Sequence, residues 1–269
     1  MLALLATGAC SSALNYADPS GPRYAGHFSG IDADPALRIV TFNIKFSREI
    51  DRAIELLQKN HDLRNPDIIA LQEMNNAGVD RIARALGMNY VYYPSAFHPT
   101  ASGDFGNALL VKGTIEADHK ILLPHLSRFQ HLARAVVAAD VVVDGIRLRA
   151  YSVHLATPFE ISGSERRDQA LAIVEDAARY PGPVVIAGDF NSRGLVGDVF
   201  GRAGFQWVTR DAGHTISFFS WDHIFVRGLA LKAPPRKGIV LNNNGASDHL
   251  PVWAEMLPQG AVVPVATGP

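Results

Sequence analysis

Hydrophobic and polar positions alternate in a regular way from Leu37 onward. Residues 38–44 alternate and are rich in β-branched side chains, which predicts a strand. Apolar residues over 50–57 then follow the spacing of one helix face, with Ser47 as the expected N-cap. Residues 67–73 form a short, almost wholly apolar run, which is typical of a strand buried on both faces. The domain is therefore expected to begin with a β–α–β unit.

The next segments repeat this alternation. Residues 79–86 have helical spacing, and Gly87 is expected to end that helix. Short strands are expected over 90–93 and 108–111. The segment 113–133, which carries three histidines at six-residue spacing, is expected to be a solvated loop, with a loop lining the substrate as the alternative. These histidines are His119, His125 and His131.

A hairpin signal then changes the fold class. Two β-rich runs, 135–143 and 146–155, meet at Asp144-Gly145, a strong short-range signal for a hairpin. A parallel start followed by a hairpin predicts mixed sheets. We therefore expect an α/β (α+β) fold with two packed mixed β-sheets and helices outside. The remaining elements expected are a helix over 164–180 and strands over 183–187, 222–226 and 250–256.

The two ends of the chain differ from the domain at 37–258. Residues 1–10 form an apolar run that ends in small residues and the only cysteine, Cys10. This resembles the end of a bacterial lipoprotein signal peptide, and the alternative is a frayed apolar terminus. We expect a lipid anchor at Cys10 that binds the membrane and holds the protein in the cell envelope, or a cytoplasmic location if that interpretation fails. Residues 11–36 are interpreted as a linker and 259–269 as a flexible tail.

Composition and the absence of known motifs exclude several classes of function. A formal net charge of −1 argues against holding nucleic acid by bulk electrostatics, although local contacts with a few phosphates remain open. A single cysteine excludes an internal disulfide and a thiolate zinc cluster. The sequence holds no Gly-x-Ser-x-Gly elbow, Walker loop, Gly-x-Gly-x-x-Gly or His-Glu-x-x-His motif. We expect a monomer.

Polar residues occur where the predicted strands end. Alone, each has an ordinary interpretation, because Asn and Asp favour turns. Sites in α/β folds, however, gather outside strand ends, so we expect these side chains to share one cleft. Their oxygen-rich set suits Mg²⁺ or Mn²⁺, which serve phosphoryl chemistry. They are Asn43, Glu73, His154, Asp189, Asn191, Asp222, Asp248 and His249.

Seven short motifs in order resemble the endonuclease/exonuclease/phosphatase superfamily of Mg²⁺-dependent phosphoesterases. The resemblance runs from about Leu37 to Leu257 and implies a four-layer α/β sandwich. The motifs are residues 41–44 (TFNI), 71–73 (LQE), 106–110 (GNALL), 152–155 (SVHL), 188–191 (GDFN), 221–225 (WDHIF) and 247–249 (SDH).

The resemblance also implies roles for single residues. Glu73 would be the main metal ligand, with Asn43 and Asp248 nearby. Asp189 would orient and deprotonate the attacking water, and Asn191 would hold a phosphate oxygen. The other implied roles are His249 contacting the scissile phosphate, Asp222 orienting His249, His154 facing the phosphate or the leaving oxygen, and Asn107 supporting the site through hydrogen bonds.

Two basic residues, Lys45 and Arg134, each have two alternative interpretations. Abasic-site enzymes of the superfamily usually carry an acidic residue two positions after the first Asn, where this chain has Lys45. Lys45 is expected either to meet substrate phosphate or to be solvated. Arg134 is expected either to bind phosphate or to lie on the wet face of a strand.

The function expected is hydrolysis of a phosphodiester, with a lipid headgroup or small phosphoester favoured as substrate. The alternatives are an extracytoplasmic DNase I-like endonuclease and a phosphate-binding module without turnover. Specificity is expected to lie in loops such as 94–104 and 158–163.

Overall fold

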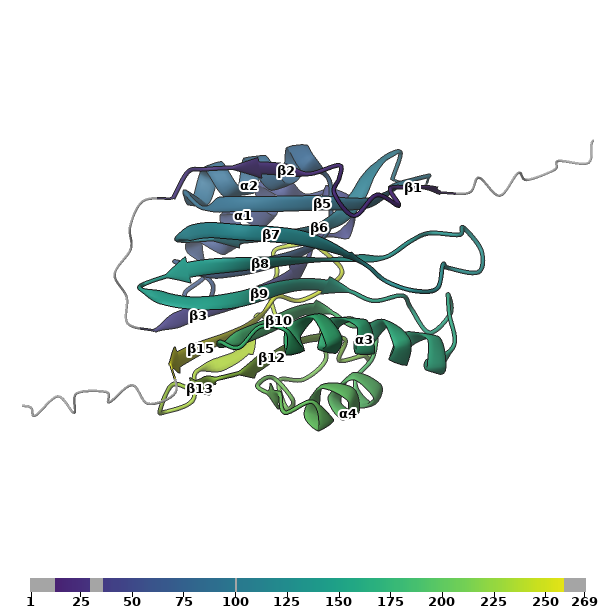
Figure 1. Ribbon diagram of the computed structural model, residues 1–269. Coiled ribbons are helices and arrows are strands. Elements are labelled where there is room, and N and C mark those ends of the chain that lie inside the picture. Colours follow the sequence, from purple (N-terminus) through teal and green to yellow (C-terminus); the bar gives the residue numbers. More distant parts are fainter. Residues whose placement is uncertain (1–12, 30–35, 100, 259–269) are drawn as a thin grey trace, which may run out of the picture.

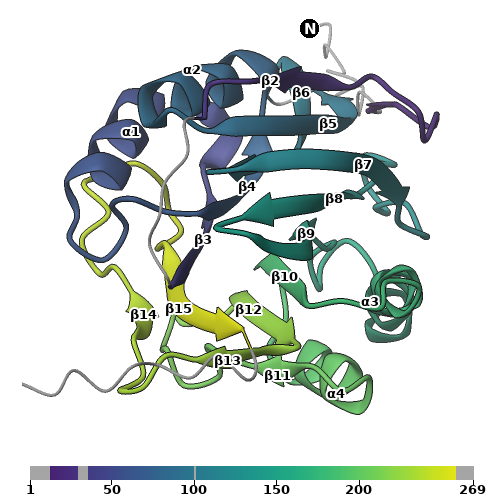
Figure 2. The ribbon, with the colours of Figure 1, turned by 60° about the vertical axis from the view of Figure 1, so that its left-hand side comes forward.

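Two mixed β-sheets packed face to face form the body of the protein in the computed structural model, which describes residues 13–29, 36–99 and 101–258 (Figure 1). Helices α1 (Ile50–Lys59) and α2 (Asn76–Leu86) cover the outer face of one sheet. Helices α3 (Gly163–Ala178) and α4 (Gly194–Arg202) cover the outer face of the other. The fold is therefore a four-layer α/β sandwich, which confirms the expected fold class (Figure 2).

The first sheet is built around β3, which pairs in parallel with β4 and antiparallel with β15. Its strand order is β1-β5-β6-β4-β3-β15-β13, with β2 added to β5 and β14 added to β15. The strands are β1 (Leu14–Asn15), β2 (Tyr24–Gly26), β3 (Leu37–Asn43), β4 (Ile68–Met74), β5 (Asn89–His98), β6 (Gly103–Val111), β13 (Leu229–Leu231), β14 (Lys237–Ile239) and β15 (Val252–Pro258).

The second sheet is built around β10, which pairs in parallel with β9 and antiparallel with β12. Its strand order is β11-β12-β10-β9-β8-β7. The strands are β7 (Thr114–Leu122), β8 (Ala135–Val143), β9 (Ile146–His154), β10 (Val184–Asp189), β11 (Gln206–Trp207) and β12 (Asp222–Arg227).

The central strands are apolar on both faces because each face meets another layer. On β3, Leu37 and Ile39 join the core between the sheets, whereas Val40 and Phe42 pack toward α1 and α2. Burying both faces removes the polar–apolar alternation that a half-exposed strand shows. These central strands therefore hold their carboxyl ends rigidly, which is where the polar residues lie.

Two sequence predictions that depend on a left-handed backbone conformation are confirmed. Asp144 and Gly145 join β8 and β9, and both have positive φ angles, 49° and 77°. This is the geometry of a two-residue hairpin turn. Gly87 ends α2 in the left-handed conformation, with φ 60°.

Two expectations about local structure are wrong. Ser47 does not cap α1, whose N-cap is Glu49; instead the Ser47 Oγ accepts a hydrogen bond from the Asn75 backbone N at 2.9 Å. The segment 113–133 is not all loop, because residues 114–122 form β7 at the edge of the second sheet. Most side chains of this edge strand are at least partly exposed, and many of them are polar. The alternation of apolar and polar residues that predicts a strand is therefore weak over 114–122.

The three histidines of this segment do not form a common site. His119 lies on β7 and its Nε2 is 3.1 Å from Asp176 on α3. His125 Nε2 is 2.9 Å from Asp168, also on α3. These pairs tie the segment to the outer helix.

The segment 11–36 contributes structure to the domain where it is described. β1 pairs with β5 and β2 pairs with β5 farther along, so part of the predicted linker extends the first sheet. Cys10 and the tail 259–269 lie outside the described residues. Among the described helices, none combines the length and apolarity needed to span a bilayer.

Candidate active site

The register of the second sheet aligns three of the predicted site residues. Asp189 ends β10, and its Cα partners are His154 on β9 and Asp222 on β12. One row across three neighbouring strands therefore carries an imidazole and two carboxylates. All three side chains are buried.

Gly188 permits this close alignment. A Cβ atom at Gly188 would lie 2.0 Å from the Val153 carbonyl oxygen on β9, which is far inside van der Waals contact. Any side chain here would push β10 away from β9 and separate Asp189 from His154. The glycine in the Gly-Asp-Phe-Asn motif is thus a steric requirement of the site.

The first sheet adds Asn43 and Glu73 from the carboxyl ends of two parallel strands. Asn43 ends β3, while Glu73 lies in an irregularity of β4 where the register with β6 shifts between Leu71 and Met74. Glu73 has a φ of 58°, an uncommon left-handed conformation for a residue with a long side chain. Such backbone strain concentrates at functional sites, and here it accompanies a carboxylate that accepts hydrogen bonds from Asn43 Nδ2 and from the Phe46 backbone N.

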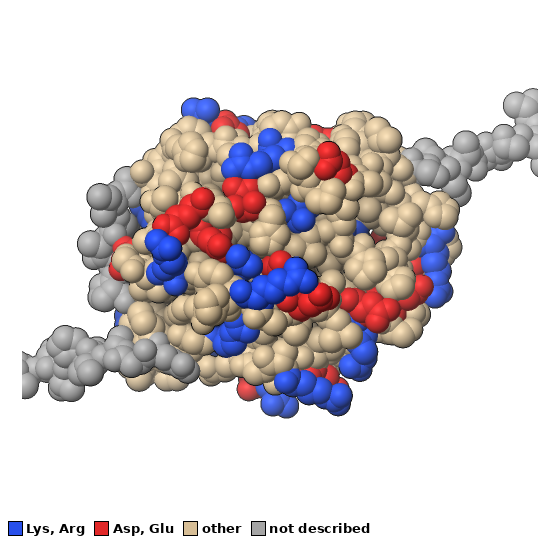
Figure 3. All heavy atoms as spheres, viewed as in Figure 1, with Lys and Arg blue, Asp and Glu red and all other residues tan. Residues whose placement is uncertain are grey.

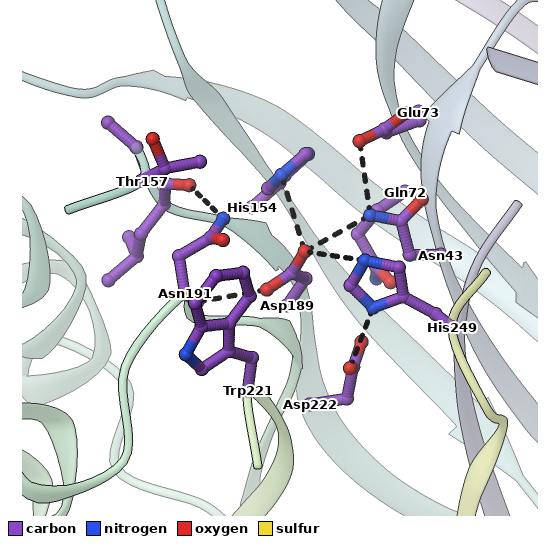
Figure 4. Close-up of polar contacts among 12 residues, drawn as sticks. Asn43, Gln72, Glu73, His154, Thr157, Asp189, Asn191, Trp221, Asp222 and His249 are labelled. Carbon is purple, nitrogen blue, oxygen red and sulfur yellow. Dashed lines mark hydrogen bonds and ion pairs between the residues drawn. The ribbon is translucent and has the colours of Figure 1, made fainter. Parts of the chain in front are cut away.

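The Asn43 amide links the two sheets (Figure 4). Its Nδ2 donates to Glu73 Oε1 at 3.2 Å and to Asp189 Oδ2 at 3.1 Å. Its Oδ1 accepts from the Lys45 backbone N at 3.2 Å. One fully buried amide thus holds two carboxylates close together.

The Asp189 carboxylate lies at the centre of the cluster. Its Oδ1 accepts from the Asn191 backbone N at 2.9 Å, while Oδ2 lies 3.5 Å from His154 Nε2 and 3.7 Å from His249 Nε2. Burial and the Asp222 charge raise the pKa of Asp189, against the opposing effects of His249 and the hydrogen bonds. A buried carboxylate with a raised pKa is a better base than a solvated one.

His249 is held by Asp222 on its far side. Its Nδ1 donates to Asp222 Oδ2 at 2.8 Å, and its backbone N donates to Ser247 Oγ at 3.2 Å. Burial alone would lower the pKa of His249, but the charges of Asp222 and Asp189 outweigh it and raise that pKa to about 10. In the absence of a metal ion, His249 is therefore an imidazolium between two carboxylates.

His154 has the opposite character. Burial, Arg134 and His249 all lower its pKa well below the usual value, so the imidazole is neutral at pH 7. The Arg134 Nη1 lies 3.0 Å from the ring nitrogens and donates to one of them, while Nε2 faces Asp189. A neutral ring with Nε2–H directed at the centre of the site fits both contacts.

Arg134 is buried, so the interpretation that it lies on a wet strand face is wrong. Its Nη2 donates to both Glu160 carboxylate oxygens, at 3.2 and 3.0 Å. Among the described residues, none accepts a hydrogen bond from its Nε. The guanidinium is thus held by Glu160 through Nη2 and by His154 through Nη1.

Asn191 and Asn107 both use their amide groups on backbone carbonyls. Asn191 Nδ2 donates to the Leu155 oxygen at 2.9 Å. Asn107 Nδ2 donates to the oxygens of Ala135 and Ser152, at 2.9 and 3.3 Å. Asn107 thereby joins the two sheets under the site, as a supporting residue would.

Asp248 sits at the edge of the cluster and is half exposed. Its Oδ2 forms an ion pair with Lys45 Nζ at 2.8 Å. Burial would raise the pKa of Asp248, but the hydrogen bond and charge of Lys45 and the charge of His249 outweigh it, and the pKa is lowered. The lysine that replaces the acidic residue of abasic-site enzymes therefore pairs with a predicted metal ligand.

Two groups of side chains bring ligand atoms for a divalent cation together. Ligand atoms of Asp189, Asp222 and His249 lie within 4.8 Å of one another, but the protonated His249 donates to Asp222, so this group binds a cation only after His249 loses its proton. Glu73 is the other candidate: burial raises its pKa, and among the described residues it forms no ion pair with Lys or Arg. A carboxylate desolvated in this way gains most from a hard cation. Asn43 presents its NH₂ group to Glu73, so its oxygen reaches a cation there only after the amide rotates.

Three residues around the site were not predicted. Gln72 is buried below Glu73 and donates to Ser152 Oγ at 3.1 Å. Glu160 holds Arg134, and Trp221 stacks its ring on Phe219 at 4.5 Å between centroids. Gln72 and Trp221 stand in the motifs beside Glu73 and Asp222, a signal that could have found them. Glu160 lies in the loop 158–163, which was expected only to determine specificity.

Comparison with known proteins identifies the family of this chain. A family model described as Endonuclease/Exonuclease/phosphatase family matches residues 40–249, which is most of the chain. The chain belongs to this family. The members of this family are metal-dependent hydrolases that act on phosphodiester bonds.

Individual relatives are distant. A UPF0294 protein of Vibrio cholerae is 29% identical over 126 residues, which is 44% of this chain and 43% of the relative. This alignment therefore spans less than half the length of that curated relative. Two solved structures share the fold, D. rerio TDP2 complexed with a single-strand DNA product and the human Nocturnin catalytic domain with a bound sulfate anion. They have TM-scores of 0.66 and 0.67 at 19% and 15% identity, covering 83% and 87% of this chain and 99% and 97% of theirs.

Proposed function

We propose that the protein is a Mg²⁺-dependent phosphodiesterase in which Asp189 orients and deprotonates the attacking water. The observation that carries this proposal is the surroundings of Asp189. Its Oδ2 atom faces Asn43, His154 and His249, and burial raises its pKa. Orientation and a raised pKa are the two properties that a carboxylate base needs.

The residues around Asp189 bind the phosphate and stabilise its charge. The His249 imidazolium supplies positive charge beside the scissile phosphate, and Asp222 maintains that charge through the 2.8 Å hydrogen bond. The His154 Nε2–H donates to a phosphate or leaving oxygen, and Arg134 fixes the ring that carries it. Asn191 would hold a phosphate oxygen with the second N–H of its Nδ2 group, whose first N–H donates to the Leu155 carbonyl.

Glu73 would hold the cation, together with Asp248 and a rotated Asn43. When bound, Mg²⁺ neutralises phosphate charge and polarises the phosphoryl oxygen. Asp248 becomes available when Lys45 releases it, and the Lys45 ammonium is then free for a substrate phosphate. Mn²⁺ is the alternative cation, since the same hard oxygen donors bind it.

A lipid headgroup or a small phosphoester is the substrate class that we favour. On the face shown in Figure 3, Lys and Arg side chains are interspersed with Asp and Glu and form no continuous basic stripe. A long nucleic acid is usually held by such a stripe. The structural likeness to TDP2 complexed with a DNA product supports a second candidate, an extracytoplasmic DNase I-like endonuclease.

A substrate panel tests the proposed function. The purified protein is assayed on bis-p-nitrophenyl phosphate, sphingomyelin, phosphoinositides and plasmid DNA, each with Mg²⁺ or with EDTA. We expect Mg²⁺-dependent hydrolysis of the small or lipid phosphoester. Cleavage of plasmid DNA alone would favour the endonuclease, and inactivity on the whole panel would favour a phosphate-binding module.

A further inference from the structure

Exposed apolar side chains gather at one end of the molecule, on β1, on the end of β5 and on the neighbouring loops. Single exposed apolar residues are ordinary, but several together mark an interaction surface. We call the following set the apolar loop patch: Leu14 is 67% exposed, Phe97 41%, Leu126 48%, Phe129 71% and Phe159 74%.

Backbone contacts hold the first part of this patch together. Leu14 on β1 is the Cα partner of Phe97 on β5, and cross-strand partners point to the same side of a sheet. The Ala13 backbone N donates to the Gln130 oxygen at 2.9 Å, next to Phe129. Asn15 Nδ2 donates to the His131 oxygen at 2.7 Å. The start of the described chain is therefore bound to the β7–β8 loop.

A second link brings in the loop between β9 and α3. The Arg128 backbone N donates to the Glu160 backbone oxygen at 3.1 Å. Phe129 and Phe159 are the chain neighbours of these two residues, so they lie on adjacent loop segments. Glu160 also holds Arg134, which contacts His154. The patch therefore borders the candidate active site, and Figure 1 shows β1 and both loops at the same end as the carboxyl end of β9.

We infer that the apolar loop patch inserts into a lipid surface and holds the active site against the headgroups. Aromatic and leucine side chains on protruding loops, with the exposed Arg128 side chain among them, suit the boundary between headgroups and acyl chains. In the sequence, Cys10 precedes Leu14 by four residues and follows an apolar run. Docking does not depend on catalysis, whereas the lipid-headgroup substrate class rests on the proposed function.

Flotation with vesicles tests this inference. The full-length chain carries Cys10→Ser, so that no acyl group contributes, and is mixed with phosphatidylcholine vesicles with or without phosphatidylglycerol. We expect the chain to float with both, and to remain bound in ~0.5 M salt because the contact is apolar. Adding Phe129→Ser and Phe159→Ser should weaken partitioning by roughly tenfold or more, because two aromatic rings lose their burial in lipid.

A matched variant separates the patch from general surface hydrophobicity. Leu241 is 77% exposed but lies in a different part of the chain, so Leu241→Ser should bind vesicles like the parent. The inference is overturned if the parent does not float, if the double variant floats equally well, or if Leu241→Ser loses as much binding. Loss of binding in high salt, or a dimer in sedimentation that the double variant abolishes, would also overturn it.

Activity on a soluble substrate keeps this test apart from the proposed function. The double variant should hydrolyse bis-p-nitrophenyl phosphate as fast as the parent. If no variant hydrolyses it while flotation still depends on the two phenylalanines, the proposed function fails and the lipid-docking inference stands.

Discussion

His249 and Asp222 form a buried pair in which the imidazole Nδ1 donates to the Asp222 Oδ2 at 2.8 Å. The two residues are 27 positions apart and come from different sheets, since Asp222 begins β12 and His249 precedes β15. Their contact therefore depends on the packing of the sheets. It determines the charge of the imidazole that faces Asp189.

The first prediction concerns the protonation of His249 in metal-free protein. Its pKa is raised from 6.5 to about 10, so the pair stabilises the fold most below pH 6.5 and loses that stabilisation as the pH rises through about 10. Asp222→Asn should lower the pKa of His249 by about 1–3 pH units, since one of its two carboxylate neighbours is removed. Nuclear magnetic resonance titration of the imidazole in EDTA measures this, and an unchanged pKa would refute the role of Asp222.

The second prediction concerns Glu73 and the cation. Glu73→Gln keeps the size of the side chain but removes the negative charge, so the affinity for Mn²⁺ should fall by at least about tenfold. Titration calorimetry measures the affinity, and excess metal should partly restore activity. Glu116→Gln on the surface strand β7 is the matched control, which should bind metal like the parent. Equal affinities for both variants would remove Glu73 from the metal site.

The third prediction concerns the buried pair of Arg134 and Glu160. Glu160→Ala leaves the guanidinium buried without its carboxylate, which should lower the free energy of unfolding by about 3–5 kcal/mol. The exposed pair of Arg179 and Glu175 is the control, and Glu175→Ala should cost less than about 1 kcal/mol. Denaturant unfolding measures both. Similar losses would mean that Arg134 is not held as the structure shows.

Much of the fold could be predicted from the sequence because its signals are local. The hairpin at Asp144-Gly145 and the end of α2 at Gly87 depend on backbone conformations that few residues adopt. Helix α4 was not predicted, since its three glycines, Gly194, Gly197 and Gly201, lower helix propensity. Its stability comes from packing on the second sheet, which no local pattern reveals.

The site could be predicted in part for the same reason. Asn43, Glu73 and Asp189 stand at strand ends, so position along the chain indicates where they gather. The partners that set their chemistry come from distant segments. The contact between Arg134 and Glu160, and that between Lys45 and Asp248, required the folded chain.

The replacement of one oxygen of Asp189 by nitrogen tests the central claim most directly. Asp189→Asn is nearly isosteric, and the other partners of the site stay in place. The measurement is the rate of Mg²⁺-dependent hydrolysis of the best substrate from the panel, with circular dichroism as the check on folding. A positioned base contributes about 10²–10⁴-fold, so we predict a loss of that size in a folded protein. A folded Asp189→Asn variant within about threefold of the parent, or full activity of the parent in EDTA, would contradict the proposed mechanism.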